Sequence, residues 1–164
     1  MKSKGFEHFS SSGILKEMLK ERGEAPTREN LSNLANELMR VRPQGGILHV
    51  SHEKAHQAGH KDYILESIHR VSEADYIRSI GGKILGVDAD IKKRYERAFA
   101  RQEGEKDNVT FEQFVSDTQR EEEGATGSGP NIRAVLKGAD AIILNNGSLE
   151  ELHAQVDAVL ARLR

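Results

Sequence analysis

The feature that most constrains the fold is an alternation of short β-rich runs with longer amphipathic stretches. The β-rich runs predict four strands, at residues 6–10, 62–67, 83–88 and 140–145. The amphipathic stretches carry apolar residues at helical spacing and predict helices over 12–22, 27–40, 44–58, 72–80, 90–102, 110–123, 131–139 and 148–163. Strands that alternate with helices favour an α/β fold with a largely parallel sheet.

Helix boundaries are marked by capping residues in three places. Ser12 or Ser11 is the expected N-cap of the first helix, and Thr27 is the expected N-cap of the second. Asn30 follows Thr27 at the spacing of an imperfect capping box. Gly59 is expected to end the helix that spans 44–58, because glycine tolerates the left-handed backbone of a C-terminal cap.

Length and composition exclude several classes of protein. The 164 residues suffice for one domain, 1–164, with a sizeable core. Lysine and arginine number 24 against 26 acidic residues, a net charge of −2 without the basic excess of a nucleic-acid-binding protein. No cysteine is present, which excludes disulfides, thiolate metal sites and cysteine nucleophiles. Residues 1–13 lack an apolar signal region, so we expect a cytoplasmic protein without a membrane span.

One string, "HEKAHQAGHKD" at 52–62, matches the H-E-x-x-H pattern of zinc peptidases through His52, Glu53 and His56. An extended motif of this kind needs a methionine turn downstream, but all three methionines lie upstream of His52. We therefore favour a solvated helix face and expect no dedicated metal site. Adventitious zinc or nickel binding by His52 and His56 is expected, since histidines at i and i+4 can chelate. A metallopeptidase or other metal-binding protein stays as the least favoured alternative.

A second string, "GATGSGPN" at 124–131, superficially resembles a phosphate-binding loop. That loop requires lysine and a hydroxyl residue where this chain has Pro130 and Asn131. The preceding "REEE" would also repel a triphosphate. We interpret the string as part of a lid that spans about 102–130, a stretch too long for a plain connection.

The segment "ILESIHR" at 64–70 pairs a strand-end carboxylate with an arginine four residues later. It resembles the corresponding segment of nucleoside monophosphate kinases, members of the P-loop nucleotide kinase family. The resemblance implies that Glu66 orients magnesium through water and that Arg70 holds the phosphate of the acceptor. Both roles suit these side chains. A carboxylate can orient magnesium, and a guanidinium binds phosphate through two hydrogen bonds.

Further segments resemble the same family in the same order along the chain. In "VDADIKKRYERAFAR" at 87–101, Arg97 and Arg101 match an R-x-x-x-R pair that would stabilise charge on the transferring phosphoryl group. Upstream, "HFSSSGILK" and "TREN" resemble the start of the acceptor-side helices, about 11–58. The implied acceptor-binding residues there are Ser10, Ser11, Lys16 and Arg28, with Lys16 standing where these kinases carry arginine.

The C-terminal segment "ADAIILNNGSLEELHAQVDAVL" at 139–160 resembles dephospho-coenzyme A kinases and related nucleotide kinases. It implies that Asn145, Asn146 and Gly147 turn the chain beside the adenine of the bound nucleotide. The resemblance as a whole runs over nearly all 164 residues, and the order of its segments carries more weight than any one of them.

The resemblance implies a three-layer P-loop kinase-like parallel sheet with strand order 2-3-1-4-5. The first strand, P-loop and helix of that fold are missing here, a unit of about 25 residues. Because the missing strand is the central one, the strands at 62–66 and 83–87 are expected either to pair directly or to leave edges unpaired. Unpaired edges favour a homodimer.

The implied activity is phosphoryl transfer from ATP, with magnesium, to a nucleoside monophosphate or to dephospho-coenzyme A. The expected partner is a small-molecule nucleotide, with no nucleic acid and no membrane. Without the phosphate loop we expect at most trace activity from 1–164. The alternatives are a start site assigned too far downstream and a remnant that binds a nucleotide or a partner without catalysis.

Overall fold

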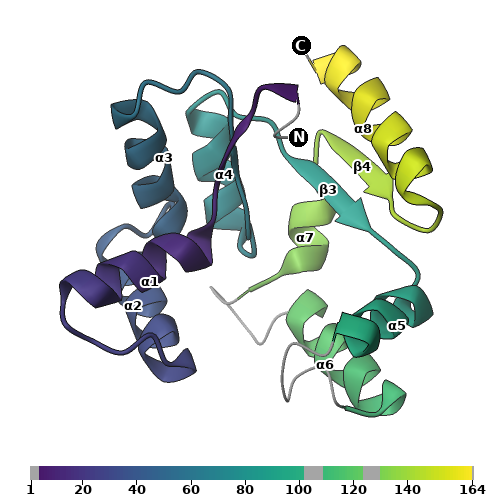
Figure 1. The fold of residues 1–164 in the computed structure, drawn as a ribbon, viewed down its shortest axis with the longest axis horizontal. Helices are drawn as coiled ribbons and strands as arrows, with labels where there is room; N and C mark the ends of the chain where they lie inside the picture. The colour runs from purple at the N-terminus through teal and green to yellow at the C-terminus, as the bar shows by residue number, and fades with distance from the viewer. Residues whose placement is uncertain (1–3, 102–108, 124–129, 164) are drawn as a thin grey trace. The chain divides into compact units, whose positions relative to one another are not determined.

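The computed structural model describes residues 4–101, 109–123 and 130–163 (Figure 1). These residues form a mixed α/β structure with short parallel strands, as the alternating pattern predicts. The chain divides into two compact units, 1–82 and 83–164. The prediction of a single domain over 1–164 stays a prediction, and each unit is described by itself.

Unit 1 has the order β1 (Glu7–Phe9), α1 (Ser11–Glu21), α2 (Arg28–Val41), α3 (Ile47–Gln57), β2 (Tyr63–Leu65) and α4 (Val71–Ser79). Strands β1 and β2 pair in parallel, with Glu7 opposite Tyr63 and Phe9 opposite Leu65. Both strands are half-buried throughout.

The core of unit 1 lies between α1, α2 and α3. Leu19, Leu34 and Leu48 each contribute a side chain that is at most 2% exposed. Each comes from a different helix, so the apolar stripe of every helix faces the other two. The amphipathic spacing of the sequence is therefore sufficient to explain this core.

The N-caps match the sequence prediction at α2 but not at α1. Thr27 caps α2, and its side chain accepts a hydrogen bond from the backbone N–H of Asn30 at 3.1 Å. The N-cap of α1 is Ser10, so the prediction of Ser12 or Ser11 is wrong by one or two residues. Three consecutive serines are equivalent capping residues on propensity alone, and tertiary contacts of Ser10 select among them.

The bounds of α3 are set by two glycines with positive φ. The helix begins at Ile47 rather than at 44, because Gly46 has φ +50° and precedes it as the N-cap. At the other end Gly59 has φ +74°, and the N–H of His60 donates to the carbonyl of Ala55 at 3.1 Å. This left-handed turn confirms that Gly59 ends the helix.

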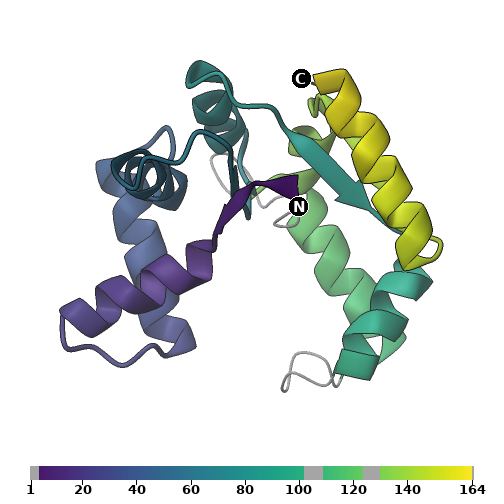
Figure 2. The ribbon, with the colours of Figure 1, turned by 45° about the horizontal axis from the view of Figure 1, so that its top comes forward.

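Unit 2 has the order β3 (Leu85–Asp88), α5 (Ile91–Arg101), α6 (Phe111–Glu123), α7 (Ile132–Lys137), β4 (Ala141–Leu144) and α8 (Leu149–Leu163). Strands β3 and β4 pair in parallel, with Leu85 opposite Ala141 and Asp88 opposite Leu144. Helix α8 lies alongside this sheet in both views (Figure 1, Figure 2). The side-chain amide of Gln155 on α8 bonds both the N–H and the carbonyl of Leu144.

Strands β2 and β3, which were expected either to pair directly or to leave edges unpaired, belong to different sheets. In the described part of the chain, β1 pairs with β2 and β3 pairs with β4, so each sheet has two strands. The P-loop kinase-like layout and the homodimer expected from free edges stay predictions.

The predicted lid, about 102–130, is described only in part. Helix α6 lies within it, whereas 102–108 and 124–129, which include most of the "GATGSGPN" string, lie outside the described residues. No helix among the described residues has the length and apolar character needed to cross a membrane.

Candidate functional site

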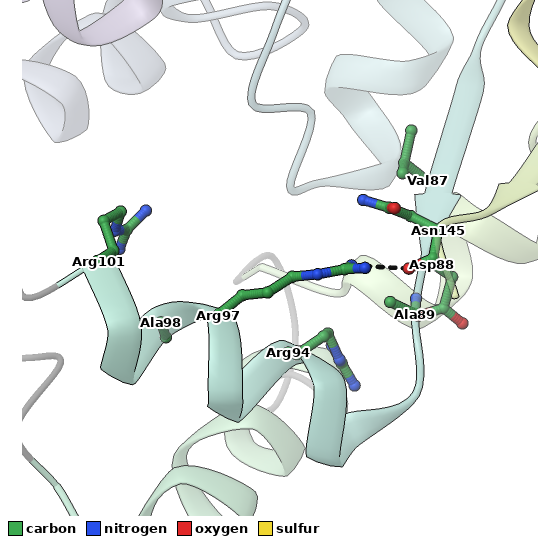
Figure 3. Close-up of a pocket in the computed structure, with 8 residues that line it drawn as sticks. All are labelled: Val87, Asp88, Ala89, Arg94, Arg97, Ala98, Arg101 and Asn145. Carbon is green, nitrogen blue, oxygen red and sulfur yellow. Dashed lines mark hydrogen bonds between the residues drawn. The ribbon is translucent and has the colours of Figure 1, made fainter. Parts of the chain in front are cut away.

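A pocket of about 350 Å³ lies in unit 2, beside the ends of β3 and β4 and along α5 (Figure 3). Its volume falls in the range typical of small-molecule sites. Eight residues line it: Val87, Asp88, Ala89, Arg94, Arg97, Ala98, Arg101 and Asn145. Three of these residues are arginines and one is a carboxylate.

Helix α5 supplies the arginines of the pocket. Arg94, Arg97 and Arg101 recur at intervals of three and four residues, which places them along one side of a helix. Arg97 extends from α5 toward the segment after β4, and its Nη1 donates to the backbone carbonyl of Asn145 at 2.7 Å (Figure 3). The structure thus brings together three residues predicted from sequence, Arg97, Arg101 and Asn145.

Two pocket residues, Asp88 and Arg94, were not predicted as site residues. Asp88 is the last residue of β3, and its Oδ1 accepts the N–H of Ala89 at 2.7 Å. The end of a parallel strand is a common place for ligand-binding groups, so its position was a usable signal. Arg94 donates from Nη2 to Glu122 of α6 at 2.9 Å, a contact that local sequence cannot reveal.

The other two residues predicted to lie beside the adenine do not line this pocket. The side-chain oxygen of Asn146 accepts the N–H of Asp90 at 2.7 Å, and its carbonyl accepts from Lys93. Gly147 precedes Ser148, whose N–H donates to Glu151 at the start of α8. Asn146 thus holds the turn between β4 and α8, and its part in ligand binding stays a prediction, as does that of Gly147.

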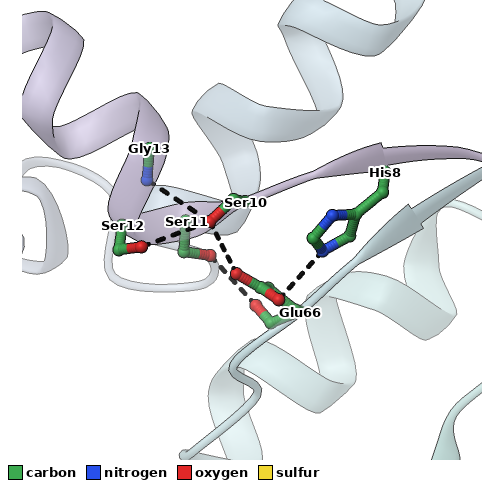
Figure 4. Close-up of polar contacts among 6 residues, drawn as sticks. All are labelled: His8, Ser10, Ser11, Ser12, Gly13 and Glu66. Carbon is green, nitrogen blue, oxygen red and sulfur yellow. Dashed lines mark hydrogen bonds and ion pairs between the residues drawn. The ribbon is translucent and has the colours of Figure 1, made fainter. Parts of the chain in front are cut away.

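A second group of predicted residues meets in unit 1 around Glu66 (Figure 4). The Ser10 hydroxyl donates to Glu66 Oε1 at 2.8 Å, and Ser11 donates to the Glu66 backbone carbonyl at 3.0 Å. His8, which was not predicted, places its Nε2 2.9 Å from Glu66 Oε2. The β1–β2 pairing brings His8 to this carboxylate, although the two residues are far apart in sequence.

The environment of Glu66 favours its charged form. Burial acts to raise the pKa of this carboxyl, but the hydrogen bonds from Ser10 and His8 outweigh burial and hold the pKa below its ordinary value of 4.5. Each carboxylate oxygen retains another lone-pair position, so Glu66 can still accept a hydrogen bond from a magnesium-bound water. The predicted role of Glu66 in orienting magnesium stays a prediction.

Glu66 gives the stability of the protein a specific pH dependence. Because its pKa is lower in the folded state, its contribution is complete above the ordinary value of 4.5 and is lost as the pH falls below it. We expect the stability difference between wild type and Glu66→Gln to shrink as the pH falls from about 6 to about 3.5. Urea denaturation at steps across this range measures it. A difference that stays constant across the range would contradict the prediction.

The remaining predicted acceptor-binding residues belong to unit 1 and lie on α1, on α2 and at the N-cap of α4. Arg70 Nη1 lies 3.4 Å from Glu73 Oε1, and Glu73 is 3% exposed. Lys16 is exposed on α1, and Arg28 is exposed at the first turn of α2. Their roles stay predictions.

Two residues of the zinc-peptidase motif have partners at the C-cap of α2 and on β2. Glu53 accepts from Arg42 at 2.7 Å, and His52 Nδ1 lies 2.6 Å from the Tyr63 hydroxyl. Among the described residues, no group of three or more histidine, cysteine or acidic side chains is placed to hold a metal ion. The metallopeptidase alternative stays untested.

Comparison with known proteins gives one informative match. The chain is similar to a UPF0200 protein. That protein, from Hyperthermus butylicus, is 27% identical over 163 residues, which cover 99% of this chain and 84% of the relative. No family model matches the chain. The match covers both units rather than one motif.

Proposed function

We propose that this chain is a nucleotide-binding protein of the P-loop kinase type and that its reaction is ATP-dependent phosphoryl transfer to a nucleotide-type acceptor. The observation that carries the proposal is the pocket of unit 2, in which Arg97 and Arg101 line the same cavity as Asn145. These residues come from two segments that independently resemble nucleotide kinases. Their meeting in one pocket is what a shared nucleotide site requires.

The pairing of the strands supports the same proposal. In the family order 2-3-1-4-5, strand 2 neighbours strand 3 and strand 4 neighbours strand 5. Counting the missing strand as the first, these are the pairs β1–β2 and β3–β4, both parallel as found. The two parallel pairs are therefore consistent with the order on either side of its central strand.

The chemistry of the pocket residues fits phosphate groups. Guanidinium groups bind phosphate oxygens through charge-assisted hydrogen bonds, and they stabilise charge that develops during transfer. ATP and magnesium would supply the phosphoryl group and neutralise its charge. Arg97 and Arg101 would hold the phosphates, and Asp88 offers an acceptor for a sugar hydroxyl. In unit 1, Glu66 would orient magnesium through water, and Arg70 and Arg28 would hold the acceptor.

Binding of ATP to purified 1–164, measured by isothermal titration calorimetry, tests the proposal. We expect Arg97→Ala and Arg101→Ala each to weaken binding about tenfold, since each removes a hydrogen bond to a charged group. Arg120→Ala is the matched control, because Arg120 lies on α6 with a side chain 71% exposed and does not line the pocket. Wild-type protein that fails to bind ATP, ADP or dephospho-coenzyme A would overturn the proposal.

A protein that binds a nucleotide without catalysis is the second candidate. It is favoured by one observation, the lack of a G-x-x-x-x-G-K-[ST] string in these 164 residues. Intact mass spectrometry of the protein from its source cell separates the candidates. A mass larger by about 25 residues would supply the loop and favour the kinase. A mass equal to 164 residues would favour binding alone, and turnover by 1–164 at about 1–100 per second would contradict the need for the loop.

A further inference from the structure

Helix α3 carries two histidines one turn apart that the proposed function does not use. His52 and His56 stand at i and i+4, and their ring centroids lie 6.3 Å apart. His56 is exposed and His52 is half-buried, so the pair faces solvent on one side. Residues at this spacing are neighbours on a helix surface, and small rotations of the two rings would let one cation bind both.

The orientation of His52 is fixed by a neighbour from another element. Its Nδ1 lies 2.6 Å from the hydroxyl of Tyr63, the first residue of β2. In the tautomer that carries its proton on Nδ1, this ring donates to the hydroxyl and leaves Nε2 unprotonated, which is the form that binds a metal. Metal-binding histidines commonly donate their second ring nitrogen to such a partner. Tyr63 is itself packed edge-on against Phe9 of β1.

We propose that His52 and His56 form a two-histidine site for a divalent transition-metal cation, with Tyr63 as the residue that positions His52. Water would complete the coordination sphere. Imidazole is a preferred ligand of zinc, copper and nickel, and this defines the class of cation. The inference is independent of the nucleotide pocket, which lies in the other unit.

Among the described residues, no third histidine or acidic side chain is placed to bind a cation together with the pair. His49 stacks on Tyr76 with ring centroids 4.9 Å apart. Glu53 accepts a hydrogen bond from Arg42, so its carboxylate already has a partner beside the pair.

Titration of purified 1–164 with Ni²⁺ alone, and separately with Zn²⁺ alone, tests the proposal by calorimetry. We expect one cation per chain. His52→Asn and His56→Asn should each weaken binding at least tenfold, and Tyr63→Phe should weaken it about tenfold through loss of the positioning hydrogen bond. His60→Asn is the matched control: His60 lies four residues after His56, and its ring contacts Phe9. It should leave affinity unchanged.

Two outcomes would overturn the proposal. Unchanged affinity in Tyr63→Phe would mean adventitious chelation only. Two surface histidines that chelate a cation by chance do not depend on Tyr63 to orient His52. An equal loss of affinity in His60→Asn would mean that the cation binds the histidines of this region without preference for His52 and His56. Should a variant fail to fold, nuclear magnetic resonance of the wild-type imidazole rings decides: Zn²⁺ should shift His52 and His56 before His49, His60 and His153.

Discussion

Replacing Glu73 by leucine is expected to destabilise the protein by about 3 kcal/mol. Glu73 Oε2 accepts the backbone N–H groups of His69 and Arg70 at 2.8 and 3.0 Å, and Oε1 faces the Arg70 guanidinium. The side chain is 4% exposed, so water cannot replace these contacts once leucine is present. Urea denaturation followed by circular dichroism measures the loss.

Two further variants separate the contributions of Glu73. Arg70→Ala removes the ion pair but keeps both backbone hydrogen bonds, and we expect it to cost less than Glu73→Leu. Glu73→Gln keeps an acceptor of similar shape, and its cost should also be smaller. If Arg70→Ala proved as costly as Glu73→Leu, the ion pair rather than the capping of α4 would be the main stabilising contact. Arg70 would then stabilise the fold through its contact with Glu73.

Replacing Leu48 by alanine is expected to cost about 3 kcal/mol. Leu48 is 0% exposed in the core where α3 meets α1 and α2. Truncation removes buried methyl groups and leaves a cavity that Leu19 and Leu34, on the other two helices, can fill only in part. Urea denaturation measures the loss of unfolding free energy.

The matched control for this cavity is the same substitution at an exposed leucine. Leu149 is 61% exposed, and Leu149→Ala should change stability by less than about 0.5 kcal/mol. Equal effects of the two substitutions would show that Leu48 is not in a close-packed core. The contrast tests the packing of the three helices without reference to any ligand.

Secondary structure was predictable where local signals are strong. Thr27 heads α2 as expected, because a capping side chain acts on its own helix. The N-cap of α1 was missed, because Ser10 is selected by its hydrogen bond to Glu66, 56 residues away. The strands are shorter than predicted, since apolar runs do not record where pairing with a second strand stops.

In the candidate site, too, local signals were predictable and tertiary contacts were not. Arg97 and Arg101 could be assigned to one helix side from spacing, and Asn145 could be placed in the turn after a strand. That Arg97 donates to the carbonyl of Asn145 was not predictable, because it depends on how α5 and β4 pack in unit 2. His8 beside Glu66 required the β1–β2 register for the same reason.

Helix positions, capping glycines and the alternation of α and β follow from the order of residues, because they rest on contacts within a few positions. Which polar side chains meet follows from pairing between distant segments. Packing placed His52 against Tyr63, Glu66 between Ser10 and His8, and the arginines of α5 beside Asp88. Local periodicity carries no information on contacts between residues that are far apart in the sequence. These contacts are therefore known only from the tertiary structure.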